Sequence, residues 1–229
     1  MLSIIIPALN EEETIQSCLK RLQPLRDLGA EVIVVDGGSE DRTVPLARGL
    51  ADAVIEAPRG RASQMNAGAR RARGARLLFL HADTVLPKNA LEEIDSALDG
   101  ARHVWGRFDV RFDSPLRILS VVAFLMNRRS RYTGIATGDQ AIFVERVAFE
   151  RVGGYPNIAL MEDIALSSAL KHVTRPICVR SKVTTSGRRW ELNGPIRTIL
   201  LMWRLRLAFF FGADPSHLAI EYMYAQRNW

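Results

Sequence analysis

Carboxylates stand shortly after two strongly apolar runs of this sequence. Asp36 directly follows the run 31–35, and Asp83 comes three residues after the run 76–80. In an open α/β sheet, ligands bind at the carboxyl ends of the parallel strands, so we expect both side chains there. Asp83 could bind a hard divalent cation that bridges a diphosphate, and Asp36 could accept an N–H of a base. A helix cap at Asp83 and a turn at Asp36 are the structural alternatives.

A further carboxylate pair, Glu162 and Asp163, stands at the start of a helical pattern over 163–171. If the amino end of that helix points into the same cleft, Asp163 can take the proton of an acceptor hydroxyl as a general base. Acids in the first turn are also favoured by the helix dipole, so an ordinary stabilising role is the alternative.

In the first half of the chain, apolar runs alternate with helical patterns, which predicts an α/β fold with a parallel sheet covered on both faces. Strands are expected at 3–6, 31–35, 53–56 and 76–80. Helices are expected at 62–72 and at 11–22, the latter with Asn10 as its cap.

The second half has a different pattern. The segment 103–113 alternates as a half-exposed antiparallel strand does, and 141–144 is typical of a central strand. Short strands flank 176–184, and helices are expected over 196–211 and 216–225. We therefore predict one continuous α/β domain with a mainly parallel sheet, a small antiparallel part and a helical carboxyl terminus.

Composition excludes several classes of protein. The chain has 229 residues, of which 48% are hydrophobic and 24% charged, unlike a disordered, collagenous or coiled-coil protein. Cys18 and Cys178 form no metal-binding spacing, and we expect reduced thiols in a cytosolic protein without a signal peptide. The first loop, 7–12, lacks G-x-G-x-x-G, and no G-x-x-x-x-G-K-[ST] occurs, which argues against dinucleotide and P-loop sites.

Basic residues exceed acidic ones, 31 against 25, and all but four of the basic residues are arginines. Arginine binds phosphate bidentately, so nucleotide phosphates, nucleic acid or anionic lipid could be partners. A compositional bias of the source is the alternative.

The segment 196–211 combines apolar residues with three arginines and is too interrupted for a spanning helix of ~20 mostly apolar residues. It could lie in a membrane interface, or pack on the domain or on a second subunit.

Several motifs resemble those of family 2 glycosyltransferases with the GT-A fold. The opening 3–12 is SIIIPALNEE, and 34–43 is VVDGGSEDRT. Further matches follow in the order of the family through most of 1–190: RASQMNAG at 61–68, HAD at 81–83, GDQ at 138–140, GGY at 153–155 and ED at 162–163. The resemblance implies a GT-A domain over 1–190, with a nucleotide-binding half to about residue 100 and an acceptor half after it, followed by a helical segment over 191–229.

The resemblance also implies roles for individual residues. Asp163 would be the general base with support from Glu162, and Asp83 would bind the divalent cation, Mn²⁺ or Mg²⁺. Residues expected to bind the nucleotide sugar are Pro7, Ala8, Asn10, Glu12, Asp36, Arg61, Asn66, His81 and Asp83. Residues expected on the acceptor side are Gly138, Asp139, Gln140, Arg189 and Trp190.

Two positions depart from the family pattern. The D-x-D motif is reduced to HAD at 81–83, so one of its two carboxylates is missing. His81 could touch the nucleotide or the metal shell, or be a buried structural residue. The Q-x-x-R-W motif of processive members keeps only Arg189 and Trp190, with Ser186 in the glutamine position, which argues against a polysaccharide synthase.

The implied activity is metal-assisted transfer of a sugar from a nucleoside diphosphate sugar, by default a UDP-sugar, to an acceptor hydroxyl with inversion. The acceptor could be a lipid or a small molecule. A nucleotidyltransferase is a second hypothesis, although 7–12 lacks the glycine-rich loop of such enzymes. A noncatalytic binding module is a third, and we expect no nucleic-acid partner, because no zinc-finger or RNP-like pattern is present. We expect a cytoplasmic protein, with contact to the inner face of the membrane through 196–211 and a homodimer as open alternatives.

Overall fold

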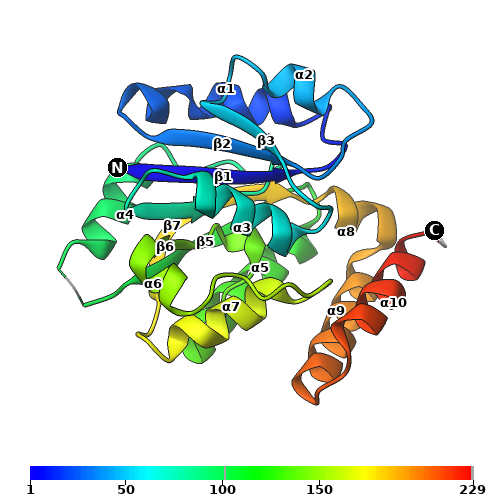
Figure 1. The fold of residues 1–229 in the computed structure, drawn as a ribbon. Coiled ribbons are helices and arrows are strands. Elements are labelled where there is room, and N and C mark those ends of the chain that lie inside the picture. Colours follow the sequence, from blue (N-terminus) through cyan, green and yellow to red (C-terminus); the bar gives the residue numbers. More distant parts are fainter. Residues whose placement is uncertain (101, 228–229) are drawn as a thin grey trace.

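A computed structural model describes residues 1–100 and 102–227, with the side chains of 224–227 outside the description. Within these residues, one seven-stranded sheet has the order β3-β2-β1-β4-β6-β5-β7 (Figure 1). Its strands are β1 (Leu2–Ala8), β2 (Glu31–Asp36), β3 (Ala53–Glu56), β4 (Arg76–Phe79), β5 (Trp105–Asp113), β6 (Phe143–Glu145) and β7 (Ile177–Ser186).

Helices cover both faces of the sheet (Figure 1). One face packs against α1 (Ile15–Asp27), α2 (Thr43–Ala47), α4 (Ala90–Leu98) and α5 (Arg117–Thr133). The other packs against α3 (Arg61–Arg71), α6 (Arg146–Arg151) and α7 (Glu162–Lys171). The remaining elements are a 3₁₀ turn, η1 (Gly138–Gln140), and the helices α8 (Arg188–Asn193), α9 (Pro195–Phe210) and α10 (Pro215–Arg227).

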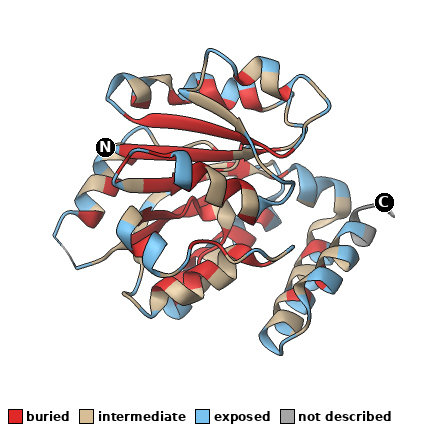
Figure 2. Cartoon of the chain, viewed as in Figure 1, coloured by how far each residue is buried: buried red, intermediate tan, exposed pale blue. Residues whose placement is uncertain are grey.

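The parallel part of the sheet forms as the apolar runs predict. β1 pairs in parallel with β2 and β4, so that Ile5 lies beside Ile33 and Phe79. Ile4 and Ile6 point into the core on one face and Ile5 into the core on the other. Because both faces are buried, β1 and β2 have no exposed polar side, and Figure 2 shows them almost entirely buried. The predicted α/β architecture with helices on both faces is confirmed.

The expectation of a half-exposed antiparallel strand at 103–113 is wrong for most of its length. β5 is antiparallel to β6 only at Trp105 and Gly106, and it runs parallel to β7 from Gly106 onward. The alternation of polar and apolar residues predicted one exposed face for this strand. That prediction fails because the polar residue Arg107 is fully buried. The Arg107 guanidinium pairs with Asp109 and donates to Ser130 Oγ at 3.0 Å, which satisfies its charge and donors inside the core.

Helix α1 starts later than predicted. Asn10 does not cap it: this residue has a left-handed backbone (φ +54°), and its side-chain oxygen accepts the Glu40 amide at 2.9 Å. The helix begins at Ile15, after Thr14, and continues to Asp27 through Pro24. Near the other end of the chain, one continuous strand, β7, replaces the two short strands expected around 176–184.

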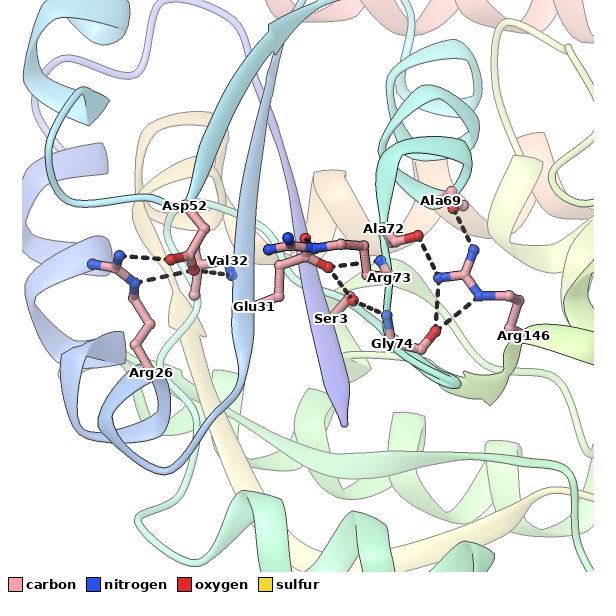
Figure 3. Close-up of polar contacts among 10 residues, drawn as sticks. All are labelled: Ser3, Arg26, Glu31, Val32, Asp52, Ala69, Ala72, Arg73, Gly74 and Arg146. Atoms are coloured by element: carbon pink, nitrogen blue, oxygen red, sulfur yellow. Dashed lines mark hydrogen bonds and ion pairs between the residues drawn. The ribbon is translucent and has the colours of Figure 1, made fainter.

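Polar contacts at the amino ends of the strands account for several arginines (Figure 3). Buried Glu31 accepts from Ser3 Oγ at 2.6 Å and from Arg73, whose backbone amide and Nε lie 2.8 and 2.9 Å away. Arg146 donates to the carbonyls of Ala69, Ala72 and Gly74; Ala69 lies in the last turn of α3, and Ala72 directly follows the helix. These arginines therefore stabilise the edge of the sheet opposite the strand ends that carry the predicted site.

Helices α9 and α10 form a hairpin that projects from the sheet domain (Figure 1). It has a small apolar cluster of its own, in which Leu205 and Leu218 pack with Met161 of the domain. The division of the chain near residue 190 stays a prediction.

Glu31 supplies a stability test. Burial raises its pKa, but hydrogen bonds from Ser3 and Arg73 and the charge of Arg73 lower it, with the balance below 4.5. We expect Glu31→Gln to lower the unfolding free energy at neutral pH by about 1–3 kcal/mol in urea denaturation, because charged hydrogen bonds are lost. The wild-type advantage belongs to the ionised carboxylate, so it shrinks as the pH falls below 4.5 through the lowered pKa. Exposed Glu150→Gln should change stability by no more than about 0.5 kcal/mol, and an equal loss in both variants would contradict this role.

Candidate active site

A cleft of about 720 Å³ opens where the carboxyl ends of β1 and β4 face the hairpin. Its walls come from the end of β1, the amino end of α3, the loop after β4, η1, the amino end of α7, α8 and α10. Nine of the predicted site residues line it: Pro7, Ala8, Arg61, His81, Asp83, Asp139, Glu162, Arg189 and Trp190.

Asp36, at the carboxyl end of β2, has one unsatisfied oxygen. Its Oδ2 accepts the amides of Gly38 and Ser39 at 2.9 and 3.0 Å. Its Oδ1 is buried and has no hydrogen-bond partner among the described residues. A buried acceptor without a partner is costly. Asp36 is not among the residues that line the cleft, and its strand neighbour Ala8 is.

The structure places Asn10 and Glu12 beside the loop that follows β2, and not in the wall of the cleft. Two hydrogen bonds connect the loops, each from a backbone amide of one loop to a side chain of the other. The Asn10 amide donates to Ser39 Oγ at 2.9 Å, and the Arg42 amide donates to Glu12 Oε2 at 3.2 Å. The loops after β1 and β2 are thereby joined next to Asp36. Asn10 and Glu12 order this loop pair through these contacts.

In the motif at 61–68, Arg61 and Gln64 line the cleft. Gln64 donates to the carbonyls of Ala8 and Val35 at 2.7 and 2.8 Å, which ties the ends of β1 and β2 together. A Cβ on Gly68 would lie 2.4 Å from Ile5 Cγ2, so glycine allows α3 to pack directly on the sheet. Sequence reasoning missed these structural roles.

Asn66 does not line the cleft, and its proposed role in binding the nucleotide sugar stays a prediction. Its side chain donates to the Tyr155 carbonyl at 2.8 Å and accepts the Tyr155 amide at 3.0 Å. It lines a separate hollow of about 270 Å³ beside Phe149 and Gly154. The side chain fixes the GGY segment to α3 and has its hydrogen bonds satisfied there.

The HAD segment packs against η1. His81 Nδ1 lies 3.5 Å from Asp139 Oδ1, and a Cβ on Gly138 would lie 2.6 Å from the His81 ring. Burial in the cleft would raise the pKa of Asp139, but the hydrogen bond and charge of His81, with the charges of Arg189 and Arg61, lower it to about 2. Asp139 therefore stays ionised at neutral pH.

Asp83 is exposed and projects into the cleft with few protein partners; Thr84 Oγ1 donates to it at 3.3 Å. The described residues contain no group of three or more His, Cys, Asp or Glu side chains that could enclose a metal ion. Protein sites for Mg²⁺ often supply one or two carboxylates and leave the other positions to substrate phosphates and water. A single exposed carboxylate beside a diphosphate site fits that chemistry.

Glu162 and Asp163 begin α7, immediately after Met161, whose backbone is left-handed (φ +70°). Asp163 accepts the Gly138 amide at 2.8 Å and the Ile164 amide at 2.7 Å. Burial raises the pKa of Asp163; these amides lower it, the Asp139 charge raises it, and the balance stays raised. Burial also raises the pKa of Glu162, as does the charge of Asp163. Of the two carboxylates, Glu162 is the one in the cleft wall.

On the acceptor side, the structure separates the expected residues. Gln140 is buried; it donates to Asn127 Oδ1 at 3.3 Å and accepts the Thr137 amide, so it anchors η1. Arg189 and Trp190 of α8 do line the cleft, and the Trp190 ring packs on Phe112 with centroids 5.4 Å apart.

Two further residues near the site were missed by sequence reasoning. Tyr222 of α10 lines the cleft, accepts a hydrogen bond from Arg189 Nη1, and has its ring 5.5 Å from that guanidinium. Arg129 of α5 has a buried Nε and Nη2 without hydrogen-bond partners among the described residues, and the charge of Asp163 acts on it. No local pattern marks Tyr222, because the family motifs end before the hairpin. Arg129 could not be singled out in the sequence, because it stands in a run with Arg128 and Arg131.

Solved structures with the same fold contain bound nucleotide sugars. The mannosyltransferase PcManGT of Pyrobaculum calidifontis, in complex with GDP-Man and Mn²⁺, matches with a TM-score of 0.67 and 22% identity over 98% of this chain and 69% of its own. S. aureus TarS, in complex with UDP-GlcNAc, matches with a TM-score of 0.65 and 17% identity over 81% of this chain and 58% of its own. These similarities confirm the predicted GT-A fold.

Curated relatives match shorter stretches. Glycosyltransferase AglE of Haloferax volcanii is 35% identical over 107 residues, 43% of this chain and 35% of AglE. The undecaprenyl-phosphate 4-deoxy-4-formamido-L-arabinose transferase of Pseudomonas paraeruginosa is 28% identical over 156 residues, 61% of this chain and 44% of that protein. The chain thus spans less than two thirds of either relative. The family model for glycosyl transferase family 2 matches residues 3–150, well over half of the chain, and the chain belongs to that family.

Proposed function

We propose that this protein transfers a sugar from a nucleoside diphosphate sugar, by default a UDP-sugar, to an acceptor hydroxyl with inversion. The observation that carries the proposal is the composition of the cleft. Arg61, Arg189 and Asp83 provide the charges that a diphosphate site needs, and buried Glu162 and half-buried Asp163, both with raised pKa values, begin α7 beside them. Relatives crystallised with UDP-GlcNAc and with GDP-Man support the nucleotide-sugar class of donor.

The base of the donor is proposed to lie against the loops after β1 and β2. The free Oδ1 of Asp36 would accept an N–H of the base, and Pro7 and Ala8 would form the adjoining wall. Both uracil and guanine carry such an N–H, so Asp36 alone does not select between them. The choice of uridine rests on the family resemblance.

The diphosphate is proposed to bind between Arg61 and Arg189, with Asp83 near it. Arginine is always charged and matches phosphate oxygens with paired donors. A divalent cation held by Asp83, Mn²⁺ or Mg²⁺, would supply Lewis-acid stabilisation to the leaving diphosphate. The missing first carboxylate of the D-x-D motif leaves this task to one protein ligand.

Asp163 is proposed as the general base, with Glu162 beside it in the cleft wall. The acceptor oxygen attacks the anomeric carbon as the bond from that carbon to the diphosphate oxygen breaks, and the hydroxyl proton passes to the Asp163 carboxylate. Attack on the side opposite the leaving group inverts the anomeric centre. The raised pKa brings the carboxylate closer to the value that suits proton transfer near neutral pH.

The acceptor is proposed to be a lipid or a small molecule. The undecaprenyl-phosphate transferase among the relatives supports a lipid. We propose that the protein acts in the cytoplasm, where contact through 196–211 would bring it to the inner face of the membrane. A nucleotidyltransferase activity gains no support from the family match, and the homodimer stays an open hypothesis.

Substitution of the two carboxylates tests the base. We expect Asp163→Asn to lower kcat by about 10²–10⁴-fold, because the proton acceptor is lost, while UDP-sugar binding measured by calorimetry persists. Glu162→Gln is the matched variant, and a smaller loss is expected. Near-normal turnover in Asp163→Asn with a large loss in Glu162→Gln would transfer the role to Glu162 and refute our assignment.

The pH dependence of kcat/KM tests the electrostatics of the base. Its acid limb should lie above 3.8, the ordinary aspartate value, because the pKa of Asp163 is raised. The negative charge of Asp139 contributes to that rise. Asp139→Asn should therefore displace the acid limb to lower pH, whereas remote Glu150→Gln should not. A displacement to higher pH would contradict the proposed coupling.

The metal role of Asp83 is tested without turnover. Thermal shifts are measured with UDP alone, Mn²⁺ alone, and both together. In the wild type we expect the two ligands together to stabilise more than the sum of each, and Asp83→Asn should remove that excess while the effect of UDP alone remains. Arg70→Gln, outside the cleft lining, is the control. If the extra stabilisation by UDP and Mn²⁺ together is undiminished in Asp83→Asn, Asp83 is not the principal ligand of the cation.

A further inference from the structure

Helix α9 has two apolar faces on opposite sides. The inner face packs in the small cluster of the hairpin and is formed by Leu201, Met202, Leu205, Ala208 and Phe209. The outer face carries six large side chains that are each 60–81% exposed: Ile196, Leu200, Trp203, Leu207, Phe210 and Phe211. Packing of the hairpin therefore accounts for only one of the faces.

The outer residues form a continuous stripe. Their spacing along the helix, with steps of three and four residues, puts them on one side at 100° per residue. Single exposed apolar residues are normal, but a contiguous stripe of six marks an interaction surface. We call these six residues the outer stripe. In Figure 2 the hairpin carries much exposed surface at the side of the domain.

Arginines flank the outer stripe on both sides. By the helical repeat, Arg197 and Arg204 lie along one border and Arg206 along the other, and no acidic residue occurs in 195–211. Arg204 pairs with Glu221 of α10, and Arg206 has a buried Nε without a partner among the described residues. An apolar stripe bordered by cations, with Trp203 near its middle, matches helices that lie in the interface of an anionic membrane.

The dimensions fit a helix that lies flat. At 1.5 Å per residue, α9 is about 24 Å long, and its stripe extends over the whole helix. Across the described part of the chain, no helix has the length and apolar character needed to pass through a bilayer. Contact with lipid through this helix would thus be peripheral.

A second copy of the chain fits the outer stripe less well than an anionic lipid surface does. Two outer stripes packed on each other would bring the arginines of both copies together. Neither α9 has an acid that could pair with them across such a contact, and Glu221 of α10 already pairs with Arg204. Helix α5 is also a weaker candidate for contact with lipid. It exposes apolar residues, but Arg128 lies over the rings of Phe124 and Tyr132, at 5.5 and 5.4 Å, and covers part of them. The outer stripe of α9 has no such cover among the described contacts.

We propose that the outer stripe of α9 docks on an anionic lipid bilayer, with the helix in the plane of the headgroups. The partner helix α10 supplies Ala219, Tyr222 and Met223 to the cleft, so the docked hairpin would hold the cleft at the lipid surface. Resting on the proposed function, this second step assigns the acceptor to the lipid class. Docking itself requires no catalytic activity.

Vesicle flotation of the full chain tests the docking. The probes are vesicles of phosphatidylcholine alone and of phosphatidylcholine mixed with phosphatidylglycerol. We expect binding to the anionic vesicles that exceeds binding to the neutral ones by about tenfold or more. Leu200→Gln with Leu207→Gln, two exposed positions, should reduce the binding by about tenfold or more. The matched control is Leu28→Gln with Val147→Gln, which removes two equally exposed apolar residues elsewhere and should bind as the wild type does.

Thermal shift with UDP, measured on the same proteins, separates the two proposals. Preserved UDP stabilisation in both double variants shows that their folds and clefts are intact. Loss of vesicle binding only in the α9 variant then supports docking. Docking is refuted if the wild type does not float, if the α9 variant floats as well as the wild type, or if the wild type is a dimer in light scattering that the α9 variant makes monomeric. Vesicle binding without any nucleotide binding would leave docking intact and refute the proposed function.

Discussion

The hydrogen bond from the Gly138 amide to Asp163 links η1 to the start of α7 at the candidate site. Gly138 begins η1, which packs on His81 after β4, while Asp163 begins α7 on the later part of the chain. The half-buried Asp163 carboxylate is stabilised in its ionised form by hydrogen-bond donors, and the amides of Gly138 and Ile164 provide two. The Gly138 amide, together with the packing of α7 on the sheet and the hydrogen bond from Ser167 Oγ to the Ala136 carbonyl, thus sets the position of the proposed base relative to the strand ends.

Each residue of η1 contributes differently to that arrangement. Position 138 accepts only glycine without displacement, since a Cβ would collide with His81. Asp139 lies on the cleft side of His81 and interacts with its ring. Gln140 fixes the turn to Thr137 and Asn127 in the interior. The family motif GDQ therefore combines a close approach, a charge and a buried anchor within three residues. Left-handed backbones at Ala141 and Met161 adjoin the site, as expected where surrounding structure enforces an unfavourable conformation.

The sequence was sufficient to predict the parallel strands, because β1 and β2 are uniformly apolar and this property is local. It also located Asp36, Asp83 and the pair at 162–163, since their positions follow from where strands end and helices begin. Distant partners set the remaining features. The sequence pattern suggests a surface position for Arg107, but Asp109 and Ser130 enclose it. Likewise, no local pattern shows that Asn66 forms hydrogen bonds with the backbone of Tyr155. Tyr222 enters the cleft only because the hairpin folds back on the domain.

The fold also distributes the arginines whose excess gives the chain its net charge. Arg73 and Arg146 stabilise the amino ends of the strands, with their donors used by Glu31 and by backbone carbonyls. Arg61 and Arg189 face the cleft, where their charges act on Asp139. A third group of arginines, Arg197, Arg204 and Arg206, lies beside the outer stripe of α9. A formal charge of +6 therefore describes no single basic surface, and a nucleic-acid interface, which requires cations gathered on one face, does not follow from it.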